Sequence, residues 1–410
     1  MGKKSHSTIG VERPNRGHPY SLTVLNRSRD SAISGRDPFL DLLRMWAMLR
    51  VLTVHLLGLA PATLLWWPAP TFIIPGMPLM FLVAGALAFK SLDPRGPSRT
   101  SSGVFVRNRL LRLLIPFWAY LAIALTLTAS LDLLHDDPAF TISPTRVALT
   151  LFPIVNPITS PVGFLGMVHL WFMVTMLWML LFAPALVRLY RWAPKAIVVG
   201  AGVVLITVYA AVLSPKITVF PEVASFGLFL FFFVLGFVYT DRTSPRTPTG
   251  ALGAAPSKLH ELLATRPAVV AALTSFLGAA LVWQVESPVA VHDSILVHAL
   301  LGFGGFCLLL AGKPYLIRVA LAFPVLLALN RRALTFYLWG WPTTALAQLA
   351  VSTAGLTGVM AVVLYFALAL GGLVVAVKIF GPLEDLPVSR TGNERAVPAN
   401  PSASLTLAQD

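Results

Sequence analysis

The chain is poor in charge and nearly without cysteine. Only 12% of its 410 residues are charged, whereas 56% are hydrophobic and the mean hydropathy is +0.77. These values lie outside the range of soluble globular proteins and indicate a membrane protein. The single cysteine, Cys307, excludes an internal disulfide and a thiolate metal cluster. Cys307 lies in the apolar stretch 301–310, so we interpret it as a small core residue.

Motifs of metal, nucleotide and serine-hydrolase sites are also missing. The sequence contains no HExxH, no Walker-type glycine loop, no GxSxG, and no His, Cys and carboxylate set at metal-ligand spacing. We therefore expect no metal. Acidic residues are few, at 17 against 31 Lys and Arg, which gives a formal net charge of +14. The basic residues fall in alternate connections between apolar segments, so we expect a lipid bilayer and no nucleic acid as partner.

The apolar segments predict an all-α, polytopic membrane protein with about ten transmembrane helices, each of about 20 residues. A weaker segment around 146–157 is short and ends at prolines, which favours a re-entrant or surface-lying helix. The ten predicted spans are 39–60, 73–92, 110–132, 167–189, 196–213, 222–240, 267–285, 290–312, 333–352 and 355–380.

The charge distribution predicts that both termini are cytoplasmic. Most basic residues fall in the connections that would then be inside, and acidic residues mark the others. Residues 1–37 and 382–410 are polar, and the first stretch has no apolar core of a signal peptide. We expect both to be disordered cytoplasmic tails that flank a membrane domain of residues 38–381.

Two ionisable residues share one face of the first predicted span. Arg44 and His55 have ten residues between them, a spacing about 20° beyond three full helical turns and roughly 16 Å along the axis. An ionisable group at membrane depth costs roughly 2.5–3.5 kcal/mol, so such groups are usually functional. A structural histidine bonded to a neighbouring carbonyl remains an alternative for His55. Asp41 can pair with Arg44, and Arg50 lies on another face and receives no role.

A second basic pair, Arg109 and Arg112, stands one turn apart at the inner end of the third predicted span. Guanidinium groups suit bidentate phosphate binding, although a positive-inside anchor would give the same pattern. His169 and Trp171 begin the fourth span on its outer side, where an interfacial aromatic belt is the alternative. His298, inside the eighth span, receives no role.

These residues resemble the signatures of the acyltransferase-3 family of integral membrane acyltransferases, over about 39–380. Arg44 and His55 match the family's Arg-x10-His motif, and Arg109 with Arg112 match its second motif. Ten helices with cytoplasmic termini also fit. Weaker matches are Phe81-Leu82-Val83-Ala84-Gly85, His169-Leu170-Trp171-Phe172 and Tyr337-Leu338.

Two positions depart from the family pattern. Ala84 replaces the usual serine, and Gly340 stands where many relatives carry a histidine, so no role is carried over to either position. No esterase-like domain follows the last predicted helix, so the chain resembles the stand-alone form of the family.

The resemblance implies transfer of an acyl group, usually acetyl, from cytoplasmic acyl-CoA to a hydroxyl group. The acceptor would be a cell-envelope glycan, a glycolipid or a secreted small molecule. Acyl-CoA is then a co-substrate, and no permanently bound cofactor is expected. The implied location is the plasma membrane of a bacterium.

His55 and Arg44 are the catalytic residues that the resemblance implies. A neutral imidazole can act as general base on the acceptor hydroxyl, and a transient acyl-histidine is the other route. Arg109 and Arg112 would bind the CoA head group at the inner mouth. The extended pantetheine arm is about as long as the distance between Arg44 and His55, so the thioester would approach the imidazole from the inner side.

The acceptor side is assigned to His169 and Trp171. The rival hypothesis is a transporter or flippase for a lipid-linked or anionic substrate, since transporters also use buried Arg and His and broken helices such as 337–342. That hypothesis predicts matching Gly or Pro breaks in the two halves of the sequence, and we find none.

Overall fold

Every regular element in the described part of the chain is helical. The computed structural model describes residues 37–58, 75–94, 100–135, 144–155, 167–243, 258–286, 294–322 and 329–386. The longer helices are α2 Pro38–Gly58, α4 Gly76–Leu92, α5 Ser102–His135, α8 Trp171–Trp192, α9 Pro194–Leu213, α10 Pro221–Thr243, α11 Lys258–Glu286, α12 Ile295–Ala311, α15 Ala333–Thr353 and α16 Gly358–Phe380. The shorter ones are α6 Pro144–Leu151, α13 Lys313–Ala322, and the 3-10 turns η3 Val168–Leu170, η4 Asn330–Arg332 and η5 Gly381–Glu384.

The chain is a multi-pass membrane protein, and the predicted all-α class is confirmed. Each of the ten predicted spans overlaps a helix. Within the described residues, six helical stretches, in α5, α8, α9, α10, α11 and α16, are long and apolar enough to cross a membrane, and the bent pair α12 and α13 could add a seventh. A count of ten spans and the cytoplasmic position of both termini stay predictions. The helix predicted near 146–157 is α6, whose eight residues are too few to span a bilayer.

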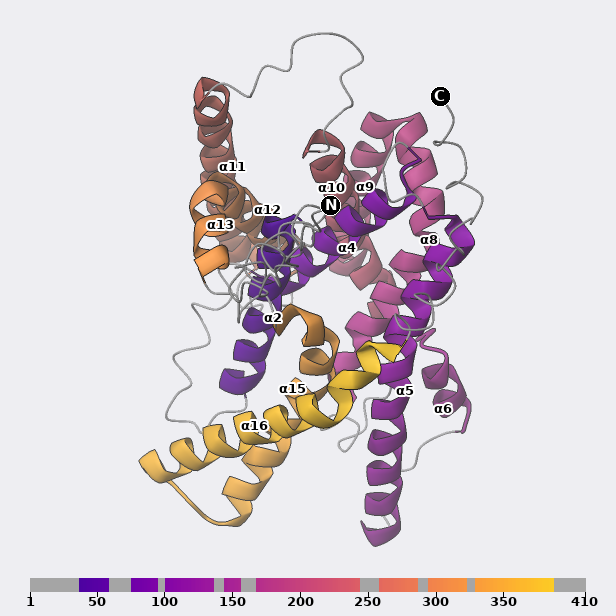
Figure 1. Cartoon of the computed structure of the whole chain (residues 1–410), viewed down its shortest axis with the longest axis vertical. Helices are drawn as coiled ribbons and strands as arrows, with labels where there is room; N and C mark the ends of the chain where they lie inside the picture. Colours follow the sequence, from indigo (N-terminus) through magenta and orange to yellow (C-terminus); the bar gives the residue numbers. More distant parts are fainter. Residues whose placement is uncertain are drawn as a thin grey trace, which may run out of the picture.

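Helix α4 occupies the middle of the molecule, packed against α2, α8, α10 and α12 (Figure 1). Two glycines let α4 and α10 approach with their backbones in contact. A Cβ at Gly85 would lie 1.9 Å from the carbonyl oxygen of Phe233, and one at Gly236 would lie 2.1 Å from that of Leu82. Small residues at a helix crossing permit such close packing in membranes. Helix α4, held by this crossing, contributes lining residues to both cavities described below.

Polar contacts anchor the first turns of α2. Tyr239 of α10 donates its hydroxyl to the Asp37 carboxylate at 2.9 Å, and Lys313 of α13 donates to the same hydroxyl at 3.0 Å. The side-chain amide of Asn330, in η4, donates to the carbonyl of Asp41 at 2.6 Å. Three separate elements therefore hold the end of α2 from which Arg44 projects.

The turn η5 is tied back onto the start of α15. Arg332 donates to the carbonyl of Gly381 at 2.5 Å and pairs with Asp385 at 2.7 Å. The Glu384 carboxylate accepts hydrogen bonds from the backbone N–H of Thr335 at 2.9 Å and from its hydroxyl at 2.5 Å. These bonds fix the segment after the last membrane helix against the membrane domain.

Most of the two predicted tails lies outside the described residues, namely 1–36 and 387–410. The first residues of the predicted C-terminal tail, 382–386, are described, and they belong to η5 and the turn after it. The boundary at residue 381 and the disorder of the two tails stay predictions.

Candidate active site

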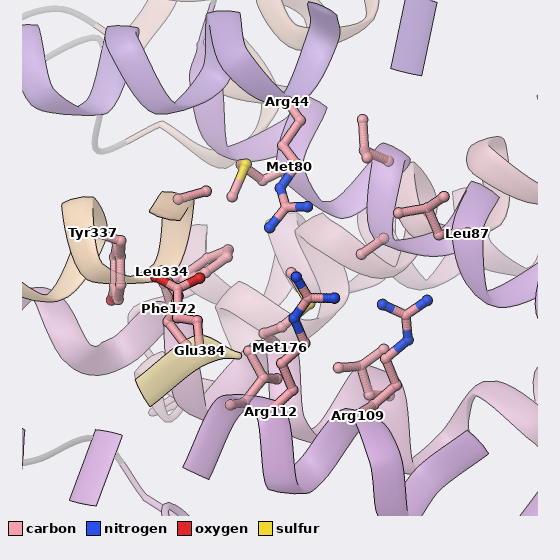
Figure 2. Close-up of a pocket in the computed structure, with 15 residues that line it drawn as sticks. Arg44, Met80, Leu87, Arg109, Arg112, Phe172, Met176, Leu334, Tyr337 and Glu384 are labelled. Atoms are coloured by element: carbon pink, nitrogen blue, oxygen red, sulfur yellow. The ribbon is translucent and has the colours of Figure 1, made fainter. Parts of the chain in front are cut away.

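Three arginines and one glutamate line a single cavity of about 120 Å³. Arg44 reaches it from α2, Arg109 and Arg112 from α5, and Glu384 from η5. Figure 2 shows the guanidinium groups of α5 pointing toward that of Arg44 across the open space. The structure thus brings together the two basic motifs that lie far apart in the sequence.

The remaining wall of this arginine cavity is apolar. It is formed by residues of α4, α8 and α15, together with Leu113 of α5. A ligand that combines an anionic part with an apolar part would match both kinds of surface. The apolar lining residues are Met80, Val83, Ala84, Leu87, Leu113, Phe172, Met176, Leu180, Ala333 and Leu334.

The charges in the arginine cavity are unbalanced. Three guanidiniums and one carboxylate leave a formal charge of +3 − 1 = +2. Arg112 repels Arg44 electrostatically, whereas Asp41 and Glu384 attract it. Among the described residues, no ion pair within 4 Å joins Arg44, Arg109 or Arg112 to a carboxylate. Partly buried cations without ion-pair partners are costly, so the cavity is suited to an anionic ligand.

A second, smaller cavity of about 10 Å³ adjoins the first and contains His55. Four residues, Met80, Phe172, Ala333 and Tyr337, line both cavities. A side chain that lines two cavities has one surface on each, so these four residues form the wall between them. The arginine cavity therefore lies next to the cavity that contains His55.

The His55 ring faces the protein interior. It lies edge-on to Trp341, with 5.2 Å between ring centroids, and to His169, with 6.3 Å. Gly340 of α15 borders the imidazole, since a Cβ there would lie 3.7 Å from Nδ1 of His55, an ordinary van der Waals distance. Both departures from the family pattern therefore fall at the site, because Ala84 lines the arginine cavity.

His169 belongs to η3, and hydrogen bonds hold it against α15. Its Nε2 lies 3.0 Å from the carbonyl oxygen of Leu338. A carbonyl only accepts, so Nε2 carries the hydrogen and Nδ1 keeps a lone pair. That Nδ1 is buried and has no hydrogen-bond partner among the described residues. The Tyr337 hydroxyl donates to the His169 carbonyl. His169 therefore presents one fixed acceptor next to the ring of His55.

Other residues singled out in the sequence lie elsewhere. Trp171 stacks on Phe229, with 5.7 Å between centroids, and lies outside the lining of both cavities. Arg50 and His298 also lie outside both linings. The structure therefore groups the two basic motifs and the two histidines but does not add Trp171 to them.

Sequence reasoning missed Glu384. It follows the last apolar segment and a Gly-Pro pair, which is the usual composition of a tail. Its side chain is nevertheless only 2% exposed. The available signal was an acidic pair, Glu384-Asp385, placed directly after a membrane helix in a chain with few acids.

Comparison with known proteins places these residues in one family. The model of the acyltransferase-3 family, described as an acyltransferase domain, matches residues 37–380. No curated protein and no solved structure matches the chain. The matched range contains both basic motifs, His55 and His169, and it ends before Glu384.

Proposed function

The chain belongs to the acyltransferase-3 family, and we propose that it transfers an acyl group from cytoplasmic acyl-CoA to a hydroxyl of a cell-envelope glycan, glycolipid or secreted small molecule. The observation that carries this proposal is the arginine cavity with apolar walls, which shares four lining residues with the cavity that contains His55. We further propose acetyl as the acyl group and the plasma membrane of a bacterium as the location, with the donor entering from the cytoplasm.

The arginine cavity is the proposed site of the donor. Phosphate groups of CoA would bind Arg109 and Arg112, because guanidiniums offer paired donors that match phosphate oxygens. Arg44 points into the same cavity, so we assign it to donor binding. This is in addition to the catalytic role that the family motif implies for it. The apolar walls would take the pantetheine arm.

The wall between the cavities is the proposed route of the thioester. Met80 lies in this wall and lines both cavities. A methionine side chain is unbranched and adaptable, so its rotation can open a passage without moving a helix. Ala333, also in the wall, is small and leaves the most room beside it.

His55 is the proposed general base. Its imidazole would take the proton of the acceptor hydroxyl while the hydroxyl oxygen forms a bond to the thioester carbonyl carbon. The carbon–sulfur bond then breaks, and the proton passes from the imidazole to the departing thiolate of CoA. His169 would orient the acceptor, because its unpartnered Nδ1 can accept a hydrogen bond from a second hydroxyl. Trp171 is proposed only to support this side of the site.

A deletion strain tests the proposal. Mass spectrometry of its envelope lipids, glycans and secreted metabolites should reveal compounds that lack one acyl increment. Expression of the intact chain should restore that increment, and expression of His55→Ala should not. His298→Ala is the matched control, since His298 is another histidine of a membrane helix but lies outside both cavities. A deletion that changes the location of a compound without changing its acylation would instead support the transporter hypothesis.

A further inference from the structure

Glu384 is a buried carboxylate inside a site that is otherwise built to attract anions. Its two hydrogen bonds, from the backbone N–H and the hydroxyl of Thr335, both fall on Oε1. No hydrogen bond from a described residue to the second oxygen is seen, and Glu384 lines the arginine cavity. The charge of Glu384 interacts electrostatically with Arg44 and Arg112. Figure 2 agrees, since it shows the carboxylate on the side of Arg112 and away from Arg109.

The position of this carboxylate is held by several bonds. The ion pair of Arg332 with Asp385 and the bond from Arg332 to the Gly381 carbonyl tie η5 to the start of α15. Glu384 cannot leave the cavity without breaking its bonds to Thr335. The carboxyl group is therefore held in a fixed position in the binding site.

We propose that Glu384 acts as an internal counter-anion that competes with the anionic head group of the donor for Arg44 and Arg112. This inference rests on the proposed function, because it takes acyl-CoA as the ligand. In the empty site the carboxylate offsets part of the repulsion between the guanidiniums. In the loaded site it repels the phosphates and weakens their binding. Glu384 thereby limits donor affinity and promotes release of CoA after each transfer.

A purely structural role predicts something different. The Thr335 N–H lies in the first turn of α15, where a carboxylate acts as a helix cap. If Glu384 served only as this cap, its loss would loosen the site and weaken CoA binding. The proposal predicts the opposite sign, because loss of the negative charge alone should tighten binding.

Binding of CoA to the full chain in lipid nanodiscs, measured by calorimetry at low salt, separates these roles. Glu384→Gln keeps an oxygen for both Thr335 bonds and removes the charge. Its Kd for CoA should fall by about tenfold, the scale of one unfavourable charge contact near a phosphate. Its melting temperature without ligand should drop, and CoA should raise that temperature more than it does in the unmodified chain.

Thr335→Val is the matched control. It removes one of the two hydrogen bonds and keeps the charge, so its Kd for CoA should stay within about twofold. Should Glu384→Gln fail to fold, Glu384→Asp draws the charge back by one methylene and should tighten CoA binding by a smaller factor. Unchanged or weaker CoA binding by Glu384→Gln, or equal tightening by Thr335→Val, would overturn the inference.

Inorganic pyrophosphate, used as a second probe, separates this inference from the donor assignment. If the unmodified chain binds pyrophosphate but not CoA, the proposed donor is wrong, and tighter pyrophosphate binding by Glu384→Gln still supports the counter-anion. If CoA binds and Glu384→Gln does not change its affinity, the donor stands and the counter-anion is wrong. Binding of neither probe overturns both.

Discussion

The two adjoining cavities differ in size and in charge. The arginine cavity measures about 120 Å³ and contains four charged residues, whereas the His55 cavity measures about 10 Å³ and has His55 as its one basic side chain, among apolar and aromatic ones. Electrostatic attraction is strong where apolar walls exclude water. Under the proposed function, the first cavity would hold the anionic donor and the second would admit only its reactive end. Binding and chemistry are therefore expected to respond separately to mutation.

The largest effect is expected at the imidazole. Replacing His55 by Ala should reduce acyl transfer by about 10²–10⁴-fold, the range for loss of a positioned general base. The Kd for CoA should not change, because the arginine cavity remains intact. A radiolabelled acetyl-transfer assay and CoA calorimetry on the same preparation check both parts. Retained turnover would remove His55 from the mechanism.

The next effect is expected in the arginine cavity. Arg112→Gln should weaken CoA binding by about 10- to 100-fold, the value of a hydrogen bond to a charged group, and should leave the rate at saturating donor nearly unchanged. Arg107→Gln is the matched control, since Arg107 is exposed on the same helix and lies outside the cavity. A parallel loss in donor and acceptor affinity would indicate a structural role for Arg112.

A substitution in the wall between the cavities should have a smaller effect, which falls on the transfer rate and not on CoA binding. Ala333 is 2% exposed and lines both cavities, so Ala333→Leu should narrow the passage. The transfer rate should fall about tenfold, and the CoA Kd should move by less than threefold, with an overpacking cost of about 1–3 kcal/mol. Ala345→Leu adds the same bulk at a buried position of α15 outside both linings. Equal losses in the two variants would mean that packing, and not the passage, is affected.

The smallest effect is expected on the acceptor side. His169→Ala removes a bond to the Leu338 carbonyl and the unpartnered Nδ1 beside His55. We expect the acceptor KM to rise by about three- to tenfold, the value of about one hydrogen bond, while the donor KM stays constant. Steady-state kinetics with each substrate varied in turn measures both. No change in acceptor KM would leave His169 with a structural role alone.

Hydropathy predicted the helices, and helical period predicted that Arg44 and His55 share a face of the first one. Apolar runs mark membrane helices because the bilayer admits little else. In the structure Arg44 and His55 line two cavities that share four lining residues, and their catalytic roles stay predictions. Arg109 and Arg112 were recognised because guanidiniums rarely continue into an apolar run. These features depend on one helix at a time, so a single sequence reveals them.

Features that depend on tertiary contacts were not predictable. The apolar pattern predicted one span that ends at residue 312. In the structure the chain bends there by 76° and continues as a second helix, α13, which the pattern did not predict. Glu384 enters the site because Arg332 and Thr335 draw η5 onto α15, a contact across about fifty residues of sequence. The sequence motif assigned Trp171 to the acceptor side of the site. In the structure its ring stacks on Phe229 of α10.

The sharpest test of the proposed mechanism is a cryo-electron microscopy structure of the full chain in nanodiscs with a non-hydrolysable acetyl-CoA analogue. Phosphate groups should contact Arg109 and Arg112, the pantetheine arm should pass Met80, and the acyl end should reach His55. An analogue bound away from the arginines, or an acyl end still separated from the imidazole by the closed wall, would contradict the mechanism.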